Sequence, residues 1–249
     1  MSALLRELLD STITQQINQL DVFPGSRVLE IGAGTGHVTA LLARAVGLVG
    51  RVVAVDDDTT YLNPSAVVDV YSRDIAVNPD ALPGDAASVD LVIARWPHHR
   101  LVDPAATIDR MLTRLRPGGW LVLADVTDTR PRVHRAATTG DEELINRVVR
   151  RLYDTALGAG GTGRWPVDVE GLLHGRGMEQ VCLSAASETW TGGGPGCGVL
   201  AGIVDHARPT LQALGVHVDD IDYFQTVMTD PNVLLRSIER RGVHARKPA

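Results

Sequence analysis

Short apolar runs alternate with helical patterns along the first half of the chain, and this alternation restricts the possible folds more than any other feature. The predicted strands cover residues 27–31, 51–55, 67–72, 91–94 and 120–124. Helical patterns cover residues 39–46 and 105–115. Strands that alternate with helices in this way are typical of a mostly parallel sheet with helices on both faces. We therefore predict an α/β fold with a doubly wound, mostly parallel sheet.

The remaining sequence adds three segments to a core at residues 23–126. Residues 1–22 carry apolar side chains at helical spacing, which predicts an N-terminal helix that packs across the sheet, forms a lid or makes a dimer contact. Residues 127–167 are polar and helical up to a glycine-rich break, which predicts an inserted helical cap. Residues 168–249 predict the completion of the sheet by a helix, a turn and a strand, followed by a loop and two amphipathic helices.

Composition excludes several classes of function. The net charge of −6 argues against a nucleic-acid partner, because phosphate binding needs a concentrated basic face. Cys182 and Cys197 form neither a CxxC pair nor a disulfide framework, and H-x-E and C-x-x-C metal motifs are absent from the sequence. No apolar run reaches membrane-spanning length, and the N-terminus lacks a secretory pattern. We expect a cytoplasmic monomer or homodimer that acts on a small molecule without a metal.

The stretch VLEIGAGTGHVT, residues 28–39, runs from a strand pattern through a glycine-rich turn into a helical pattern. Such turns usually hold the polar end of a nucleotide-like cofactor. A dinucleotide fingerprint needs G-x-G-x-x-G. Here the glycines are Gly32, Gly34 and Gly36, and His37 occupies the place of the third fingerprint glycine. The spacing therefore disfavours a nicotinamide-dependent oxidoreductase and indicates a different cofactor.

Asp56 ends the second predicted strand, in VVAVDDD, and is a candidate ribose ligand. It follows Gly36 by 20 residues, and a carboxylate at this place can accept hydrogen bonds from both ribose hydroxyl groups. The alternative is a solvent-exposed acidic turn, because Asp57 and Asp58 follow directly. The position directly after a strand favours ribose binding for Asp56.

Five motifs follow one another within residues 28–125: VLEIGAGTG, VVAVDDD, RDI at 73–75, VDLVIARWPHH at 89–99 and LRPGGWLVLAD at 115–125. Their order and spacing closely resemble the class I S-adenosylmethionine-dependent methyltransferases, especially the small-molecule branch of ubiquinone/menaquinone and sterol methyltransferases. The resemblance is strong over residues 20–125 and weak over residues 160–249. It implies a Rossmann-like fold, S-adenosyl-L-methionine as the cofactor and S-adenosyl-L-homocysteine as the product.

The resemblance also implies a set of cofactor-binding residues: Glu30, Gly32, Ala33, Gly34, Thr35, Gly36, Asp56, Asp57, Asp74, Ile75 and Arg95. Glu30 and the backbone of residues 32–36 match the floor under the methionine part, where Thr35 can bond the carboxylate. Asp74 matches the acceptor of the adenine amino group, with helix N-capping as its alternative, and Ile75 matches the apolar neighbour of the ring. Arg95 matches a position whose backbone lies beside the methionine part, and its side chain is expected to face solvent.

Methyl transfer requires mainly that a nucleophile be placed in line with the methyl carbon, and such orientation contributes roughly 7–11 kcal/mol. A phenol acceptor would also gain from a nearby base. The tentative catalytic base is His99 or His98, after the fourth predicted strand, and the alternative for both is a structural role. The tentative substrate-contacting residues are Trp96, His134, Tyr153 and Trp165, with core packing or simple solvent exposure as alternatives.

These observations predict transfer of a methyl group to an oxygen or carbon nucleophile of a small, apolar metabolite, such as a secondary metabolite. The lack of an (N/D)PP(Y/F) motif after the fourth strand argues against methylation of exocyclic amines in DNA. The main alternative is a methyltransferase-fold cyclase or isomerase that binds the cofactor without transferring its methyl group. A non-enzymatic interaction protein has little support in the sequence.

Overall fold

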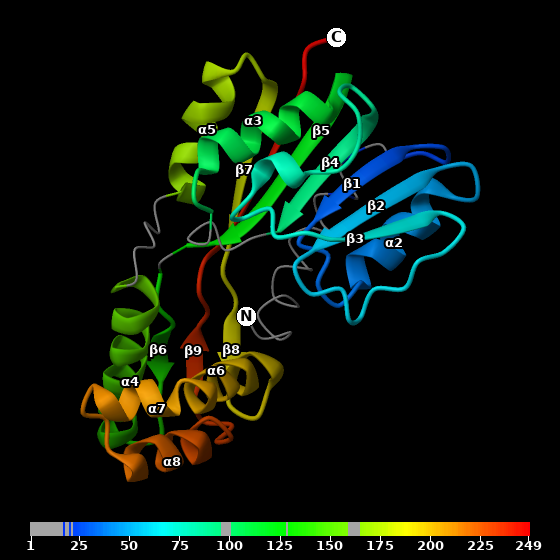
Figure 1. Ribbon diagram of the computed structural model, residues 1–249. Coiled ribbons are helices and arrows are strands. Elements are labelled where there is room, and N and C mark those ends of the chain that lie inside the picture. Colours follow the sequence, from blue (N-terminus) through cyan, green and yellow to red (C-terminus); the bar gives the residue numbers. More distant parts are fainter. Residues whose placement is uncertain (1–16, 18–19, 21, 96–100, 128, 159–164) are drawn as a thin grey trace.

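The structure of the protein is a computed structural model, which describes residues 17, 20, 22–95, 101–127, 129–158 and 165–249. The helix predicted over residues 1–22 lies almost entirely outside these residues. The described chain forms two units (Figure 1). One is built on a seven-stranded sheet, called the main sheet below. The other, called the cap, combines a three-stranded sheet with the helices α4, α6, α7 and α8.

The main sheet has the strand order β3-β2-β1-β4-β5-β10-β7. The bounds of its strands are β1 Arg27–Ile31, β2 Arg51–Asp56, β3 Val68–Ser72, β4 Val89–Arg95, β5 Leu115–Val126, β7 Glu179–Ala186 and β10 Arg240–Arg246. The strands from β3 to β5 are parallel to one another, and β10 runs antiparallel to both of its neighbours. The predicted fold class, a mostly parallel Rossmann-like α/β sheet, is confirmed.

Helices cover both faces of the main sheet, because successive side chains of a strand point to opposite faces. These helices are α2 His37–Val46, α3 Pro104–Arg114 and α5 Trp165–Gly175, with a short 3-10 helix, η1, at Pro79–Ala81. Leu29 of β1 shares an apolar cluster with Met111 of α3 and Leu173 of α5. Val28, one residue earlier, shares a second cluster with Leu42 of α2 on the opposite face. The two clusters hold the parallel strands in register, so the loops that follow them gather at one edge.

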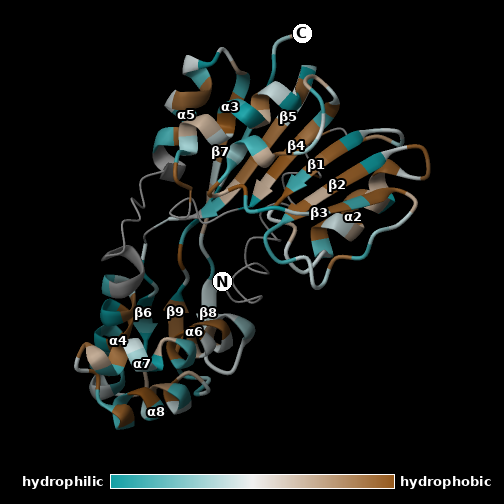
Figure 2. Cartoon of the chain, in the orientation of Figure 1, coloured by the Kyte–Doolittle hydropathy of each residue, from teal (hydrophilic) through white to brown (hydrophobic). Residues whose placement is uncertain are grey.

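The cap has its own apolar core. Its elements are β6 Arg132–Arg135, α4 Thr139–Gly158, β8 Thr189–Thr191, α6 Pro195–His206, α7 Arg208–Ala213, α8 Val218–Val227 and β9 Leu234–Arg236. The strands pair in the order β6-β9-β8. One cluster joins Val148 of α4, Leu200 of α6 and Phe224 of α8 to Leu235 of β9. Figure 2 shows apolar segments along the main-sheet strands and apolar residues interspersed with hydrophilic ones on the cap helices.

The cap continues one edge of the main sheet. In sequence, β5 leads to β6, β7 leads to β8, and β9 leads to β10, so the order β6-β9-β8 repeats the order β5-β10-β7. Backbone hydrogen bonds persist through the junction: the N–H of Thr127 donates to the carbonyl of Glu239 at 2.9 Å. The N–H of Ser237 likewise donates to the carbonyl of Glu188 at 2.8 Å. Three paired chain crossings therefore connect the cap to the carboxyl end of β5.

The C-terminal part of the chain differs from the sequence prediction. Two amphipathic helices were expected up to the C-terminus, but the structure has three helices followed by β9 and β10. β10 was missed because only Val243 and Ala245 join the apolar cluster on the α3 and α5 face, and arginines occupy both of its ends. The predicted insertion 127–167 contributes β6 and α4 to the cap, and residues 189–236 contribute its other elements.

Candidate functional site

The loop after β1 lies at the carboxyl edge of the main sheet, where ligands bind in doubly wound folds. Gly32, Gly34 and Gly36 have φ angles of 76°, 58° and 78°, a conformation that residues with side chains rarely adopt. Ala33 is buried and Thr35 is half-buried between them. The sequence therefore places glycine where the backbone needs it, and the resulting loop has little side-chain bulk above its peptide groups.

Strand β2 fixes this loop through Val55 and Asp56. The N–H of Gly32 donates to the carbonyl of Val55 at 2.8 Å. The carboxylate of Asp56, 4% exposed, accepts hydrogen bonds from the N–H of Gly34 at 2.8 Å and from the N–H of Asp58 at 3.0 Å. Asp56 is thus a buried anchor of the loop, and the alternative of a solvent-exposed acidic turn is wrong for this residue. Its role as a ribose ligand stays a prediction.

Glu30 and Arg95 form a buried ion pair beneath the loop. A guanidinium nitrogen of Arg95, Nη2, lies 2.9 Å from Oε1 of Glu30 and donates to the carbonyl of Ala33, also at 2.9 Å. The hydroxyl of Thr39 donates to Oε2 of Glu30 at 2.6 Å. The expectation that the Arg95 side chain faces solvent is therefore wrong. Alternation along β4 places Arg95 on the face of Ile93, and the β1–β4 register sets Ile93 opposite Glu30.

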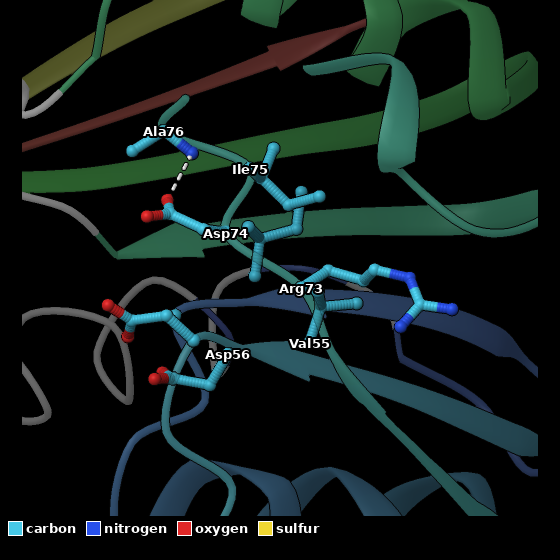
Figure 3. Close-up of a pocket in the computed structure, with 9 residues that line it drawn as sticks. Val55, Asp56, Arg73, Asp74, Ile75 and Ala76 are labelled. Carbon is cyan, nitrogen blue, oxygen red and sulfur yellow. Dashed lines mark hydrogen bonds between the residues drawn. The ribbon is translucent and has the colours of Figure 1, made fainter. Parts of the chain in front are cut away.

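A pocket of about 230 Å³, partly open to solvent, lies between the ends of β1, β2 and β3 (Figure 3). It is lined by Ile31, Gly32, Val55, Asp56, Asp57, Arg73, Asp74, Ile75 and Ala76. Oδ1 of Asp74 accepts a hydrogen bond from the N–H of Ala76 at 3.1 Å. This bond closes a turn and does not cap a helix, because η1 begins only at Pro79. Ile75, 2% exposed, gives the pocket an apolar wall between two acidic ends.

The structure thus gathers the predicted cofactor-binding residues at one edge of the main sheet, whereas two of the predicted substrate contacts, His134 and Tyr153, lie in the cap. His134 is exposed on β6 of the cap. Tyr153 packs against the cap cluster, with the guanidinium of Arg130 5.9 Å from its ring centre. Burial raises the pKa of the Tyr153 hydroxyl well above its usual value, so this group stays protonated at neutral pH. Trp96, His98, His99 and the side chain of Trp165 lie outside the described residues.

Two features of the site were not predicted from the sequence. Thr39 was assigned only to a helix, although its place nine residues after Glu30 brings its hydroxyl to that carboxylate once α2 folds back on β1. Arg73 lines the pocket although only its two successors were singled out. One signal could have indicated the burial of Arg95. It is the last residue of the run VDLVIAR, whose other residues are mostly apolar and buried.

The described part of the chain also lacks two other kinds of site. Among residues 22–95, 101–127, 129–158 and 165–249, no group of three His, Cys, Asp or Glu side chains is placed to hold a metal ion. None of the helices in the same ranges combines the length and the apolar character that a membrane span requires. The acidic groups at the strand ends can accept hydrogen bonds from a ligand.

Sequence comparison gives a family match. A family model described as "Methyltransferase domain" matches residues 5–157, which is more than half of the chain. The ubiquinone/menaquinone biosynthesis C-methyltransferase UbiE of Vibrio vulnificus is 29% identical over 109 residues, which cover 41% of this chain and 42% of that protein. The chain spans less than half the length of the curated relatives it matches.

Solved structures share the fold. A protein of Bacillus halodurans with a provisional methyltransferase assignment aligns with a TM-score of 0.60 at 19% identity, covering 96% of this chain and 100% of that one. The [4+2]-cyclase SpnF aligns with a TM-score of 0.54 at 17% identity, covering 96% of this chain and 81% of the cyclase. Both likenesses include the cap as well as the main sheet, because 96% coverage extends well beyond either unit.

Proposed function

The chain belongs to the methyltransferase domain family, and from this premise we propose that it is an S-adenosylmethionine-dependent methyltransferase acting on a small, apolar metabolite. One observation carries the proposal. A glycine loop with three positive φ angles lies beside a pocket whose walls hold carboxylates from the ends of β2 and β3. This arrangement places a backbone without projecting side chains and anionic acceptors at the same edge of the sheet, which suits a nucleoside that carries hydroxyl and amino donors.

The donors and acceptors in the pocket fit S-adenosylmethionine. The glycine loop lets a ligand approach its backbone closely, because no side chain projects from Gly32, Gly34 or Gly36. Asp56 and Asp57 are the proposed acceptors for the ribose hydroxyl groups, and Asp74 is the proposed acceptor for the adenine amino group. Ile75 offers an apolar surface to the ring. His37, exposed at the start of α2, occupies the place where a dinucleotide fold has its third glycine.

The chain's own contribution to the reaction is mainly orientation. When bound, the cofactor supplies an activated methyl group. The loop and its anchors, Val55 and Asp56, hold the cofactor in one position against a fixed sheet edge. Orientation of two reactants in this way is worth roughly 7–11 kcal/mol. We propose that His99, or else His98, accepts the proton of an acceptor hydroxyl, a role for which Tyr153 is unsuited at neutral pH because it is already protonated.

The acceptor class is proposed from the cap and from the relatives. The cap continues β5, so it stands beside the edge that holds the pocket, where it can enclose an acceptor (Figure 1). The C-methyltransferase UbiE acts, by its name, in the biosynthesis of quinones. This relative supports a carbon or oxygen nucleophile on an apolar molecule. Trp96, His134, Tyr153 and Trp165 remain the proposed substrate contacts.

A cyclase or isomerase reaction is the second candidate, and the likeness to the [4+2]-cyclase SpnF favours keeping it. In this case the cofactor would be bound but not consumed. A likeness at 17% identity concerns the fold alone, and a shared fold leaves the reaction open. Mass spectrometry of a converted acceptor separates the two candidates. Gain of one methyl group with formation of S-adenosylhomocysteine supports transfer, and conversion without either supports the second candidate.

Calorimetry with the full chain tests the cofactor assignment itself. We expect S-adenosylhomocysteine to bind tightly and NADH to show no binding, because the glycine spacing and His37 do not match a dinucleotide fingerprint. Ser65→Ala, on the loop before β3 and remote from the pocket residues, is a control that should keep wild-type affinity. Binding of NADH in place of S-adenosylhomocysteine would overturn the proposal.

A further inference from the structure

We propose that Arg95 is a positioning residue that sets the conformation of the glycine loop by neutralising Glu30 beneath it. The inference rests on the proposed function, because the loop is the part that would hold the cofactor. It also changes the role expected of Glu30. At 0% exposure this carboxylate does not reach a ligand in the pocket, so it acts through the loop and not by contact.

Hydrogen bonds at the Glu30 carboxylate join β1, β4 and α2. Nη2 of Arg95 reaches Oε1 of Glu30 and the carbonyl of Ala33, each at 2.9 Å. Ala33 lies between Gly32 and Gly34, so this bond fastens the middle of the loop to the end of β4. Thr39 of α2 donates to the other carboxylate oxygen of Glu30 at 2.6 Å. A shift of β4 or α2 relative to β1 would break at least one of these hydrogen bonds.

The charges explain why Arg95 in particular is required. Both side chains of the pair are almost fully buried, with 4% exposure for Arg95 and 0% for Glu30. A carboxylate removed from water is strongly disfavoured unless a cation and hydrogen bonds compensate it. Thr39 supplies a hydrogen bond but no charge. Arg95 supplies both, and the planar guanidinium allows one nitrogen to reach the carboxylate and the loop carbonyl together.

Among the described residues, β2 and α2, which pack against this pair, carry further ionisable groups. From β2, Asp56 faces the loop and is held by the N–H of Gly34. From α2, His37 stands at the exposed first residue, and Arg44 stands in the last turn, on the far end of the helix from Glu30. Asp56 adds a second buried negative charge on this side of the loop. Loss of the Arg95 charge would therefore leave two carboxylates around one flexible turn.

Three variants of the full chain test the role: Arg95→Met, Glu30→Gln and the double variant. The measurement is the dissociation constant of S-adenosylhomocysteine between pH 6 and pH 9. We expect Arg95→Met to weaken binding at least about tenfold at pH 8, because it removes the cation 2.9 Å from the buried Glu30 carboxylate and the donor to the loop carbonyl of Ala33. The loss should shrink toward pH 6, where Glu30 takes up a proton more readily than an exposed carboxyl group would. The wild type should show no such change.

The double variant and a conservative substitution complete the test. A neutral pair of similar volume often replaces a buried ion pair at little cost. Arg95→Met with Glu30→Gln should therefore bind S-adenosylhomocysteine within about threefold of the wild type, at every pH in the range. Arg95→Lys keeps the charge and should also bind independently of pH. If Arg95→Met is too unstable to assay, the double variant and Arg95→Lys still decide the outcome.

Arg51→Met is the matched control. Arg51 pairs with Asp69 at 2.5 Å between β2 and β3, but at the opposite end of β2 from the loop. Its loss should leave the affinity and its pH dependence unchanged. The positioning role is wrong if the wild type binds S-adenosylhomocysteine and the double variant is as weak as Arg95→Met, or if the weakness of Arg95→Met does not depend on pH. Failure of the wild type to bind would instead overturn the proposed function.

Discussion

The hydrogen bonds that stabilise the glycine loop at the pocket edge and those at the base of the cap join residues at very different separations in the sequence. At the pocket edge, Thr39 reaches Glu30 across nine residues, and Gly34 reaches Asp56 across 22. At the base of the cap, Thr127 bonds Glu239 across 112 residues. Short separations leave recognisable motifs in the sequence, whereas long ones leave only scattered apolar positions. The glycine loop and its anchor Asp56 could therefore be predicted from the sequence, whereas the cap could be predicted only in part.

The two units also have separate apolar cores. Met111 of α3 belongs to a cluster of the main sheet, and Phe224 of α8 belongs to the cluster of the cap. Between them, in the described residues, lie three chain crossings, which are joined by backbone and side-chain hydrogen bonds. Substitutions in one core should therefore affect that unit first.

Phe224→Ala should destabilise the cap by about 3–5 kcal/mol, because it removes a fully buried ring and leaves a cavity. The affinity for S-adenosylhomocysteine should stay close to the wild-type value, since the pocket lies in the other unit. Calorimetric unfolding with and without the ligand measures both quantities. Met111→Ala is the matched change in the main-sheet core. It should lower the midpoint temperature of the unfolding transition that the ligand stabilises. If Phe224→Ala abolishes ligand binding, the two units are not energetically separate.

Asp56→Ala should weaken the binding of S-adenosylhomocysteine by about 2–3 kcal/mol, because hydrogen bonds to an ionised group are lost and the loop N–H of Gly34 loses its acceptor. Isothermal titration calorimetry measures the loss directly. Asp69→Ala, which removes an acidic side chain of β3 at its ion pair with Arg51, is the control and should bind normally. Equal affinities of Asp56→Ala and the wild type would contradict the placement of the cofactor beside this residue.

The strands of the main sheet and the acidic residues of the pocket could be predicted because each carries a local signal. Val28, Leu29 and Ile31 form an apolar run that only Glu30 interrupts, which is typical of a buried parallel strand, and the glycines that follow mark a turn with positive φ. The side chain of Arg95 could not be placed in this way. Its burial depends on the register that sets β4 beside β1, which the sequence of β4 alone does not contain.

The cap could be predicted only in part, for the same physical reason. Residues 139–158 have a helical period strong enough to indicate α4 without its neighbours. Leu234–Arg236 and Thr189–Thr191 are three-residue strands, which are too short to show a period of their own. They are stabilised by pairing with each other and by Trp190, whose ring packs in the cap cluster while its N–H donates to Glu188 at 3.0 Å. Such pairing becomes visible only once the chain has folded.

Gly36→Ala should weaken binding of S-adenosylhomocysteine and lower the stability of the main sheet by about 1–3 kcal/mol, because alanine is strained at φ 78°. The added Cβ would also lie 3.2 Å from Cδ2 of Leu62 and 3.4 Å from the carbonyl of Tyr61. Gly215→Ala is the matched control in the cap, with φ 82° and open space around its Cβ. It should lose similar stability without losing affinity. Loss of affinity in both variants would break the distinction between the two units.

The two cysteines differ in burial, which makes the stability of the cap depend on pH through Cys197. Burial in α6 of the cap raises the pKa of the Cys197 thiol to about 11 from an ordinary value of 9.0, whereas Cys182 is exposed on β7 of the main sheet. Between pH 9 and pH 11 the folded cap therefore keeps a proton that the unfolded chain loses, so its stability falls as the pH rises. The loss at pH 10 should be about 1 kcal/mol. Denaturant unfolding should show a fall that is larger by this amount in the wild type and in Cys182→Ala than in Cys197→Ala, where the raised pKa of Tyr153 still contributes. An equal fall in all three would mean that Cys197 ionises as freely in the folded cap as in the unfolded chain.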